Sequence, residues 1–484
     1  MKFYCKLFAA VLAAACMALS ACSSGGYSGV MAEPDTLPKA QQPEEAARVP
    51  FADLTGEEII SNFPPEDFGG YTFTVLTSAP DRFVPEEEAA GMLNPVIQAR
   101  NELLEKRYNV KIAESYCKQS DFLSQLTVAV GAGKQLADAV SFARTDVSAA
   151  AAGDLLMNLY SVPYLQTDMR YIDAELVRKS TVKNELYVIY EPSSLFYTDL
   201  TCVVYNRTLV GAEYDVIYSP VKAGTWDYAT MLGFAESAAP EVMSKRSPDN
   251  ARDTFGIVSL LDRSELLHES FVSSGYALFG DTFHKQIEYN GDLAAADAIA
   301  ANISWLYGSK CVMNADADAA AKAFREGRAA FAVCRLGFIT TLEDCDVDWG
   351  LAPLPKMFKG QQGYHSCISE TACGISVPEC QQDPSRTGKI LTLLFASSYV
   401  GPEEALLKNL MTFTLHDNAS AIVMRRIFES PITDISLLYY QGESRLSGLG
   451  RGIVLEAVES GKTFESLVAA NAIPLRELNA LDFR

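Results

Sequence analysis

The segment YTFTVLT, Tyr71–Thr77, opens the part of the chain whose pattern decides the fold. Its β-branched and aromatic residues follow a Gly-Gly turn, which predicts a strand. The segment NPVIQARNELLEKRYN (94–109) then carries apolar residues at helical spacing. Asn94 as the cap and Pro95 at the first helical position mark where that helix begins.

The same alternation of strand and helix continues as VKIAES (110–115), DFLSQLTVAVGAG (121–133) and DAVSFA (138–143). This strand-helix-strand-helix-strand order predicts an α/β fold with a parallel sheet that helices cover on its faces. In such sheets, ligands meet the loops at the carboxyl ends of the strands. Those loops begin at Thr77–Ser78 and Ala143–Asp146.

A second α/β region is predicted beyond two strand-like segments, Glu185–Tyr190 and Thr201–Tyr205. It contains a helix capped by Thr225, a strand over DTFGIVSL (253–260), and a helix that ends near Gly308. From Asp383 onward the pattern is mostly helical. About 420 residues follow Asp67, which is too many for one core and predicts two lobes.

The N-terminus predicts export and a lipid anchor. Residues 1–21 combine Lys2 and Lys6 with an apolar run too short to span a bilayer, as in a secretory signal. The signal ends in LSAC (19–22), which resembles the lipobox of bacterial lipoproteins, a family in which the cysteine, here Cys22, is lipidated. Residues 22–66 are rich in Ser, Gly, Pro, Gln and Glu, which indicates a disordered tether. No later stretch is a persuasive membrane span, so the only membrane contact expected is through the lipid.

Charge and cysteine content exclude several classes of function. The chain has 40 Lys and Arg residues against 61 Asp and Glu residues, a formal net charge of −21, which repels nucleic acid. Eight of the 11 cysteines remain after Cys5, Cys16 and Cys22 are set aside, an even number that permits disulfides. No C-x-x-C pair occurs and only four histidines are present, so no zinc site or other metal site is predicted.

The stretch MNADADAAAKAFREGRAAFAV (313–333) looks at first like a calcium loop. Counted from Asn314, however, the sixth position is Ala319 where a Gly is needed, and the twelfth is Arg325 where a Glu is needed. The stretch instead predicts a helix capped by Asn314, Asp316 or Asp318 and ended by Gly327, followed by a strand, RAAFAV, that returns to the first lobe.

The order of motifs resembles bacterial extracellular solute-binding proteins of the sugar-binding type, a group that includes maltose-binding protein. The strongest match is residues 311–361, a helix, a returning strand, a loop and the G-x-x-P-L-P segment Gly350–Pro355. CVVYNRTL (202–209) is similar to the hinge strand of that family, and GTWDYATMLGFAESA (224–238) to one of its helix starts. GGYTFTVLTS (69–78) and RNELLEKRYNVKI (100–112) fit a lipoprotein branch of the family. The resemblance covers nearly all of residues 67–484.

The resemblance implies a two-lobed, type II periplasmic-binding-protein-like α/β fold, with discontinuous lobes joined by hinge strands. The first lobe is expected over 67–200 and 328–374, and the second over 201–327 and 375–484. The implied function is capture of a small polar solute, a carbohydrate or oligosaccharide by family analogy, and its delivery to the permease of an ABC importer. The protein would be a monomer without cofactors, anchored on the outer face of the cytoplasmic membrane as in Gram-positive bacteria.

Residues in strand-end loops, and residues matched to the relatives, are the candidate ligand contacts. They are Ser78, Arg82, Phe142, Arg144, Asp146, Tyr197, Asp199, Trp226, Tyr276, Arg335, Phe338 and Tyr364.

Each candidate also has a structural interpretation. Asp199 stands where sugar-binding relatives place a hinge carboxylate, but it can equally be a solvated turn residue. Tyr197 can stack on a sugar face or fill the hinge core, and Trp226 is interpreted first as a packed core residue. The relatives often carry Trp near Arg335 and Phe338, and this chain does not, which argues against a stacking role there. The paired tryptophans of the relatives are also absent, because TDMRYID (167–173) stands in their place, and this makes an ordinary oligosaccharide ligand less secure.

Two other functions remain open. A secreted lipoprotein glycoside hydrolase would need two opposed carboxylates, which the 61 acidic residues neither support nor exclude. No G-x-S-x-G, H-E-x-x-H or G-x-x-x-x-G-K-[ST] motif occurs, and the HES at His268 lacks a second histidine. A binding protein that senses its ligand without coupling to transport has the same sequence signature, and peptides or other polar solutes remain possible ligands.

Overall fold

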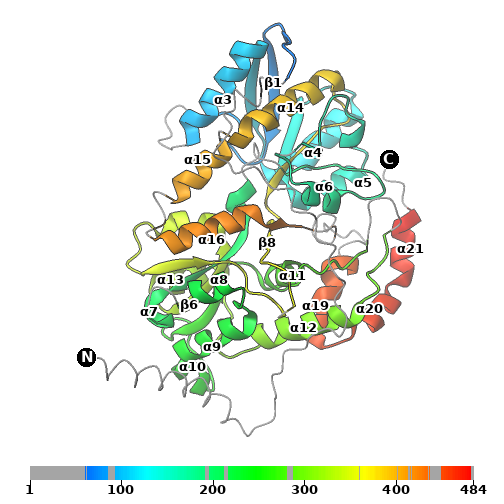
Figure 1. Cartoon of the computed structure of the whole chain (residues 1–484). Coiled ribbons are helices and arrows are strands. Elements are labelled where there is room, and N and C mark those ends of the chain that lie inside the picture. Colours follow the sequence, from blue (N-terminus) through cyan, green and yellow to red (C-terminus); the bar gives the residue numbers. More distant parts are fainter. Residues whose placement is uncertain are drawn as a thin grey trace. The chain divides into compact units, whose positions relative to one another are not determined.

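The computed structural model describes residues 60, 63–85, 93–169, 171–190, 196–211, 216–280, 287–358, 360–400, 402–411, 415, 417–433, 435 and 448–480 (Figure 1). The predicted signal, Cys22 and almost all of the predicted tether lie outside these residues. Within the described parts of the chain, no helix has the length and apolar character that a membrane crossing requires.

The first sheet has the strand order β2-β1-β3-β9. Its central strand β1 (Tyr71–Thr77) pairs in parallel with β2 (Val110–Tyr116) and with β3 (Ala139–Ala143). Helices α3 (Leu93–Tyr108) and α4 (Gln119–Gly131) connect these strands. The parallel sheet with crossover helices is therefore confirmed, and α3 begins one residue before the predicted cap Asn94.

The second sheet has the strand order β5-β6-β4-β7. Its strand β6 (Ala329–Arg335) lies between β5 (Phe255–Ser259), to which it is parallel, and β4 (Thr201–Asn206), to which it is antiparallel. Strand β7 (Trp349–Ala352) completes the sheet beside β4. β4 and β6 are buried along almost their whole length, since they are the two central strands of this sheet.

Strand pairing corrects the predicted division of the chain in two places. The strand of residues 328–333 does not return to the first sheet, because β6 pairs with β4 and β5. Conversely, β9 (Cys373–Ser376) pairs antiparallel with β3 in the first sheet, so residues just beyond 374 belong with the first sheet and not with the second. Hydrogen bonding between strands far apart in sequence decides both points.

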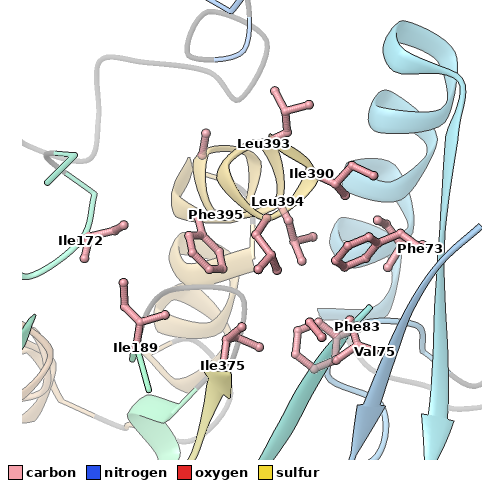
Figure 2. Packing of buried hydrophobic residues seen from close by; sticks show 14 of the residues in the cluster. Phe73, Val75, Phe83, Ile172, Ile189, Ile375, Ile390, Leu393, Leu394 and Phe395 are labelled. Atoms are coloured by element: carbon pink, nitrogen blue, oxygen red, sulfur yellow. The ribbon is translucent and has the colours of Figure 1, made fainter. Parts of the chain in front are cut away.

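The core of the first sheet is closed by a helix from the C-terminal part of the chain. Helix α14 (Pro384–Val400), gold in Figure 1, contacts α3 and contributes Ile390, Leu394 and Phe395 to a buried cluster that includes Phe73 of β1. Figure 2 shows the α14 side chains Ile390 and Leu394 pointing toward Phe73 of the sheet. The helical pattern predicted from Asp383 onward is confirmed by α14, but this helix packs on the first sheet, whereas the predicted boundary assigned its residues to the second lobe.

The folded body begins earlier than the predicted start at Asp67. Ile60 is fully buried in the same cluster, its carbonyl oxygen accepts hydrogen bonds from Phe63 N and Tyr108 Oη, and Glu66 forms an ion pair with Lys389 at 2.7 Å. The sequence pattern concealed this, because the pair Ile59–Ile60 stands between Glu-Glu and Ser-Asn and forms no strand or helix periodicity.

The remaining elements are mostly short helices around the two sheets. A two-stranded parallel ladder joins β8 (Ser366–Cys367) to β10 (Pro431–Ile432). The helices are α5 (Val147–Ala152), α6 (Ala174–Ser180), α7 (Arg207–Val210), α8 (Tyr218–Ala223), α9 (Tyr228–Ala238), α10 (Pro240–Ser244), α11 (Arg263–Ser273), α12 (Leu293–Tyr307), α13 (Ala317–Arg325), α15 (Pro402–Asn409), α16 (Asn418–Glu429), α19 (Ile453–Ser460), α20 (Phe464–Ala470) and α21 (Ala472–Ala480).

Local signals at helix starts are mostly confirmed. Asp316 caps α13 by accepting a hydrogen bond from Ala319 N at 2.8 Å, and Gly327 turns the chain with a φ of 72°. Helix α9 is capped by Asp227 and not by Thr225, because Asp227 Oδ1 accepts from Thr230 N. The predicted strand Glu185–Tyr190 forms only isolated bridges, at Glu185 and Ile189.

The eight cysteines that the structure describes are all free, and seven are buried. The pair Cys202 and Cys334 lies on adjacent strands with the sulfur atoms 3.9 Å apart.

Candidate functional site

Two predicted contacts, Arg82 and Asp199, lie close together. Asp199 ends a 3-10 turn, Phe196–Asp199, directly before β4, and its Oδ2 is 3.8 Å from Nη2 of Arg82. Burial raises the pKa of Asp199, although the charges of Arg82 and Arg335 oppose the shift. The carboxylate is thus positioned where the chain leaves the first sheet for the second. Ser78, which follows β1, lies within 3.5 Å of the sulfur of Cys373.

Asp146 lies in the 3-10 turn Arg144–Asp146 that follows β3. Gln119 at the start of α4 holds it, because its Nε2 donates to Asp146 Oδ2 at 2.5 Å while its Oε1 accepts from Ala143 N. Burial raises the pKa of Asp146, and the hydrogen bond from Gln119 opposes that shift.

Arg144 opens the same turn and is only 1% exposed. Its backbone N–H donates to Ala372 O at 3.0 Å, and its Nη1 donates to Thr433 Oγ1 at 3.4 Å. The Nε and Nη2 atoms have no hydrogen-bond partner. A buried guanidinium with a single long hydrogen bond is an unusual arrangement, because taking such a charge out of water is costly unless it is paired.

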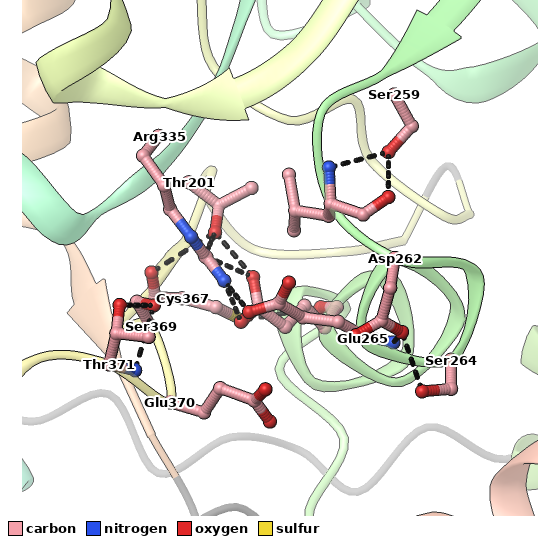
Figure 3. A network of polar contacts seen from close by, with 12 residues as sticks. Thr201, Ser259, Asp262, Ser264, Glu265, Arg335, Cys367, Ser369, Glu370 and Thr371 are labelled. Carbon is pink, nitrogen blue, oxygen red and sulfur yellow. Dashed lines mark hydrogen bonds and ion pairs between the residues drawn. The ribbon is translucent and has the colours of Figure 1, made fainter. Parts of the chain in front are cut away.

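Arg335, at the end of β6, is the centre of a buried ionic network (Figure 3). Its Nη1 donates to Glu269 Oε2 at 2.7 Å and to the hydroxyl of Thr201, and its Nη2 donates to Glu265 and to Glu269. Burial opposes the charge, but Glu269 and Glu265 raise the pKa of Arg335 above its ordinary value. The strand-end loop predicted to meet ligand is therefore anchored to helix α11 in this conformation.

Glu265 and Glu269 both face Arg335, because they are four residues apart on α11 and therefore share one face of that helix. Burial raises the pKa of Glu265 to about 7; Arg335 opposes this shift, and the carboxylates of Glu269, Glu370 and Asp262 add to it. With a pKa of about 7, Glu265 changes its protonation state near neutral pH.

A second guanidinium, that of Arg451, links the network to the segment between β8 and β9. Its Nη1 donates to Glu370 Oε2 at 2.8 Å, and its Nη2 donates to Asp262 Oδ1 at 3.2 Å. Carboxylate oxygens of Asp262, Glu265 and Glu370 lie within 4.8 Å of one another, a spacing that could hold a cation. In this conformation Arg451 and Arg335 already neutralise all three.

His268 lies between these groups and is fully buried. Burial, together with the charges of Arg451 and Arg144, lowers the pKa of His268 well below its ordinary value, so the imidazole is neutral. The HES motif that fails as a zinc signature is thus part of the polar network of α11.

Sequence reasoning missed the four network residues Glu265, Glu269, Glu370 and Arg451. The spacing of Glu265 and Glu269 could have suggested a shared helix face. Their cationic partner Arg335 lies 66 to 70 residues away along the chain, and no local pattern connects them.

The aromatic candidates of the predicted hinge and second lobe pack against protein. Tyr197 is stacked between Phe196 and Phe428, with ring centroids 4.3 and 4.5 Å away, so both of its faces are covered. Trp226 is fully buried and donates from Nε1 to Pro353 O at 3.0 Å. Tyr276 donates to Asp292 O at 2.8 Å and meets the ring of Phe271 edge to face.

The other three aromatic candidates are also engaged. Phe142 is buried and stacks on Phe122 with the centroids 4.8 Å apart. Tyr364 accepts a hydrogen bond from Trp226 N at 3.2 Å, and Nζ of Lys356 lies 5.0 Å from the centre of its ring. Phe338 is half-buried and meets Phe324 edge to face at 6.3 Å. Polar rather than aromatic candidates therefore carry the unusual features of the site.

Comparisons with known proteins agree with this architecture. A model of the family described as bacterial extracellular solute-binding protein matches residues 99–378, which is more than half of the chain. No curated protein matches the chain.

Two solved structures show the same fold at low sequence identity. The GacH receptor of Streptomyces glaucescens GLA.O, solved unliganded and with acarbose, is 15% identical with a TM-score of 0.51, and the match covers 84% of this chain and 98% of that one. A cyclo/maltodextrin-binding protein complexed with maltotetraose is 14% identical with a TM-score of 0.52, covering 84% and 97%. The likeness confirms the predicted two-lobed, type II α/β fold class.

Proposed function

Because the chain belongs to the bacterial extracellular solute-binding proteins, we propose that it captures a carbohydrate between its two lobes and delivers it to the permease subunits of an ABC importer. Capture in such a fold is hinge closure, in which the closed state is favoured by contacts that both lobes make only then. The protein acts outside the cytoplasm, as its family does.

The observation that carries the carbohydrate proposal is the ligand content of the two structures with the same fold. One was solved with acarbose and the other with maltotetraose, and both ligands are saccharides rich in hydroxyl groups. In this chain the strand-end residues Arg82, Asp146 and Asp199 supply charged groups suited to hydroxyl recognition.

The proposed hinge lies where the chain passes between the sheets. We assign the sheet β2-β1-β3-β9 with α14 to the first lobe and the sheet β5-β6-β4-β7 to the second. Between Asp199 and Thr201 the chain enters the second sheet, and between β7 and β9 it comes back. Ser369 N donates to Asp199 O at 3.1 Å, so the two passages lie side by side. This pairing supports a compact hinge whose bending would move one sheet relative to the other.

A thermal-shift screen against neutral oligosaccharides, acidic oligosaccharides and short peptides tests the proposal. A ligand that binds only the folded state raises the melting temperature, by an amount corresponding to about 2.7 kcal/mol at a hundred times its Kd. We expect stabilisation by saccharides and none by peptides. Stabilisation by peptides alone would reject the carbohydrate class while leaving capture of a solute intact.

The alternative of a glycoside hydrolase predicts a different outcome. Glu265 has a pKa raised to about 7, and perturbed proton affinity is a property of catalytic carboxyl groups. Glu269 lies beside it on α11. Their shared ion pair with Arg335 favours a structural role. Incubation of purified protein with the stabilising oligosaccharide, followed by chromatography, is expected to recover it uncleaved, and accumulation of shorter products would establish hydrolysis. A sensing protein would show the same binding without stimulating an importer reconstituted in vesicles.

Anchoring through lipid at Cys22 is part of the proposal. The small residues before Cys22 and the polar tether after it support lipidation. Metabolic labelling with a palmitate analogue is expected to mark the wild-type protein and not the Cys22→Ala variant. Labelling of both proteins would mean that the lipid is attached at another residue.

A further inference from the structure

The guanidinium of Arg144 has no counter-ion among the residues that the structure describes. It is 1% exposed, two of its three nitrogen atoms have no hydrogen-bond partner, and the third is 3.4 Å from Thr433 Oγ1. Guanidinium carries five N–H donors, and a buried one costs several kcal/mol unless carboxylates or phosphates satisfy it. The protein alone therefore leaves most of the binding capacity of this group unused.

The neighbouring carboxylates are already engaged by other guanidiniums. Glu265 and Glu269 pair with Arg335, and Glu370 pairs with Arg451. Among the residues that the structure describes, none forms an ion pair with Arg144. His268 feels the positive charge of Arg144 but is neutral, so it supplies no negative charge.

The location of Arg144 independently indicates a ligand-binding position. It is the first residue after β3, at the carboxyl edge of the parallel strands of the first sheet. Ligands of open α/β sheets bind at this edge. Its one side-chain partner, Thr433, directly follows β10, which pairs with β8 in the segment that joins the sheets. The guanidinium of Arg144 thus lies beside the β8–β10 ladder, in the segment that joins the two sheets.

We propose that Arg144 binds an anionic group of the transported saccharide, so that the solute is an acidic sugar bearing a carboxylate or a sulfate. The planar fork of arginine matches the paired oxygens of such groups in a bidentate manner. The inference rests on the proposed function, because it names the substrate class of the same site. The net charge of −21 slows the approach of an anion, but it does not weaken a contact made in a buried, low-dielectric position.

Isothermal titration with pairs of ligands, each an acid and its neutral counterpart, tests the proposal. The probes are uronate disaccharides, such as digalacturonic acid, each with its methyl ester, which keeps the rings and removes the charge. Galactose 6-sulfate, with galactose as its neutral partner, tests sulfate as the source of the anion. We expect at least one acid to bind at least tenfold more tightly than its neutral partner. In the Arg144→Gln variant that preference is expected to disappear.

Variants of arginine at two positions separate recognition from general charge effects. Arg144→Lys keeps the charge and loses the fork, and it is expected to bind the acid with intermediate affinity. The matched control is Arg252→Gln, because the Arg252 side chain is 86% exposed and pairs only loosely with Asp249. Arg252→Gln is expected to bind like the wild type.

The ligand-free protein supplies a second readout. Since Arg144 has no counter-ion, Arg144→Gln is expected to keep or raise the melting temperature without ligand. A clear loss of stability, or failure to fold, would show that the guanidinium is satisfied by the protein and would overturn the inference. Equal binding of acids and neutral partners would also overturn it and leave the proposed function standing. Absence of stabilisation by any saccharide would overturn both.

Discussion

At the scale of single residues, the most informative group is the carboxyl of Glu265. It lies four residues from Glu269 on α11, faces the guanidinium of Arg335, and is held close to Asp262 and Glu370. Burial and the three neighbouring carboxylates raise its pKa to about 7, against the opposing charge of Arg335. A group with such a pKa makes the stability of the folded state depend on pH near neutrality.

The sign of that dependence follows from proton uptake. An unfolded glutamate releases its proton near pH 4.5, whereas Glu265 in the folded chain keeps it up to about pH 7. Between these values the folded state binds more protons, so the free energy of unfolding falls as pH rises, by at most about 1.4 kcal/mol per pH unit from this group. Glu265→Gln, which mimics the protonated carboxyl, is expected to remove this part of the fall.

Urea denaturation at several pH values between 4.5 and 7.5 measures the effect. The control is Glu459→Gln, because Glu459 forms an exposed ion pair with Arg263 in which both side chains are about half exposed. In the Glu459→Gln variant, the free energy of unfolding is expected to fall with pH as steeply as in the wild type. If the fall is equally steep in Glu265→Gln, Glu265 is ionised throughout the pH range.

At the scale of elements, local chemistry decides where helices begin and end, while packing decides what they touch. Asp316 was one of three predicted caps of α13, and the Gly327 turn was also predicted, because capping needs only a side-chain oxygen within reach of the first amides. The position of α14 was not predicted, because it depends on surfaces more than two hundred residues away.

Gly388 of α14 tests that packing. A Cβ at this position would overlap the carbonyl oxygen of Pro163 and lie 2.9 Å from Leu165 N, both of them backbone atoms. Gly388→Ala is therefore expected to lower the free energy of unfolding by about 1–3 kcal/mol or more. Denaturant titration measures the change.

The matched control is Gly233→Ala in α9, where a Cβ would have no atom within 4 Å. Removing a helical glycine there is expected to stabilise the protein by about 0.5–1 kcal/mol. Changes of the same sign at both positions would mean that helix propensity, not the close approach of the 163–165 segment, dominates at Gly388.

At the scale of the whole molecule, the extent of the folded body and the membership of each sheet depend on contacts between distant segments. Ile60 precedes the first strand, which begins at Tyr71, yet it is buried with Phe73 and the α14 residues in one cluster. The folded body therefore includes Ile60, which precedes the predicted start at Asp67.

Ile60→Ala is expected to destabilise the protein by about 2–5 kcal/mol, because it removes buried methyl groups from a packed core. A truncated form that begins at Asp67 should likewise melt at a lower temperature than the full mature chain. Ile473→Ala is the control, since that side chain is 65% exposed and its loss should change stability by less than about 0.5 kcal/mol. Equal melting temperatures for Ile60→Ala and Ile473→Ala would mean that Ile60 does not contribute to the core and that the folded body starts at Asp67, as predicted.

The sequence by itself determined the fold class, the parallel strands β1, β2 and β3, most of the helices, and the family. These features repeat a period of two or 3.6 residues, or depend on caps and turns a few residues away, so a local stretch contains all the information. It also placed Arg82, Arg144, Asp146 and Asp199 in loops after strands or before the crossing strand, where structural position follows directly from strand order.

Only the tertiary structure decided which sheet receives β6, β9 and α14, and which charges meet. The apolar sequence of β6 would suit a central strand of either sheet. Its hydrogen bonds to β4 and β5 place it in the second sheet. Arg335 is paired and Arg144 is not, although Arg335 ends a buried strand and Arg144 directly follows one. The difference arises because ion pairing depends on distance in space, and the two glutamates of α11 reach one guanidinium and not the other.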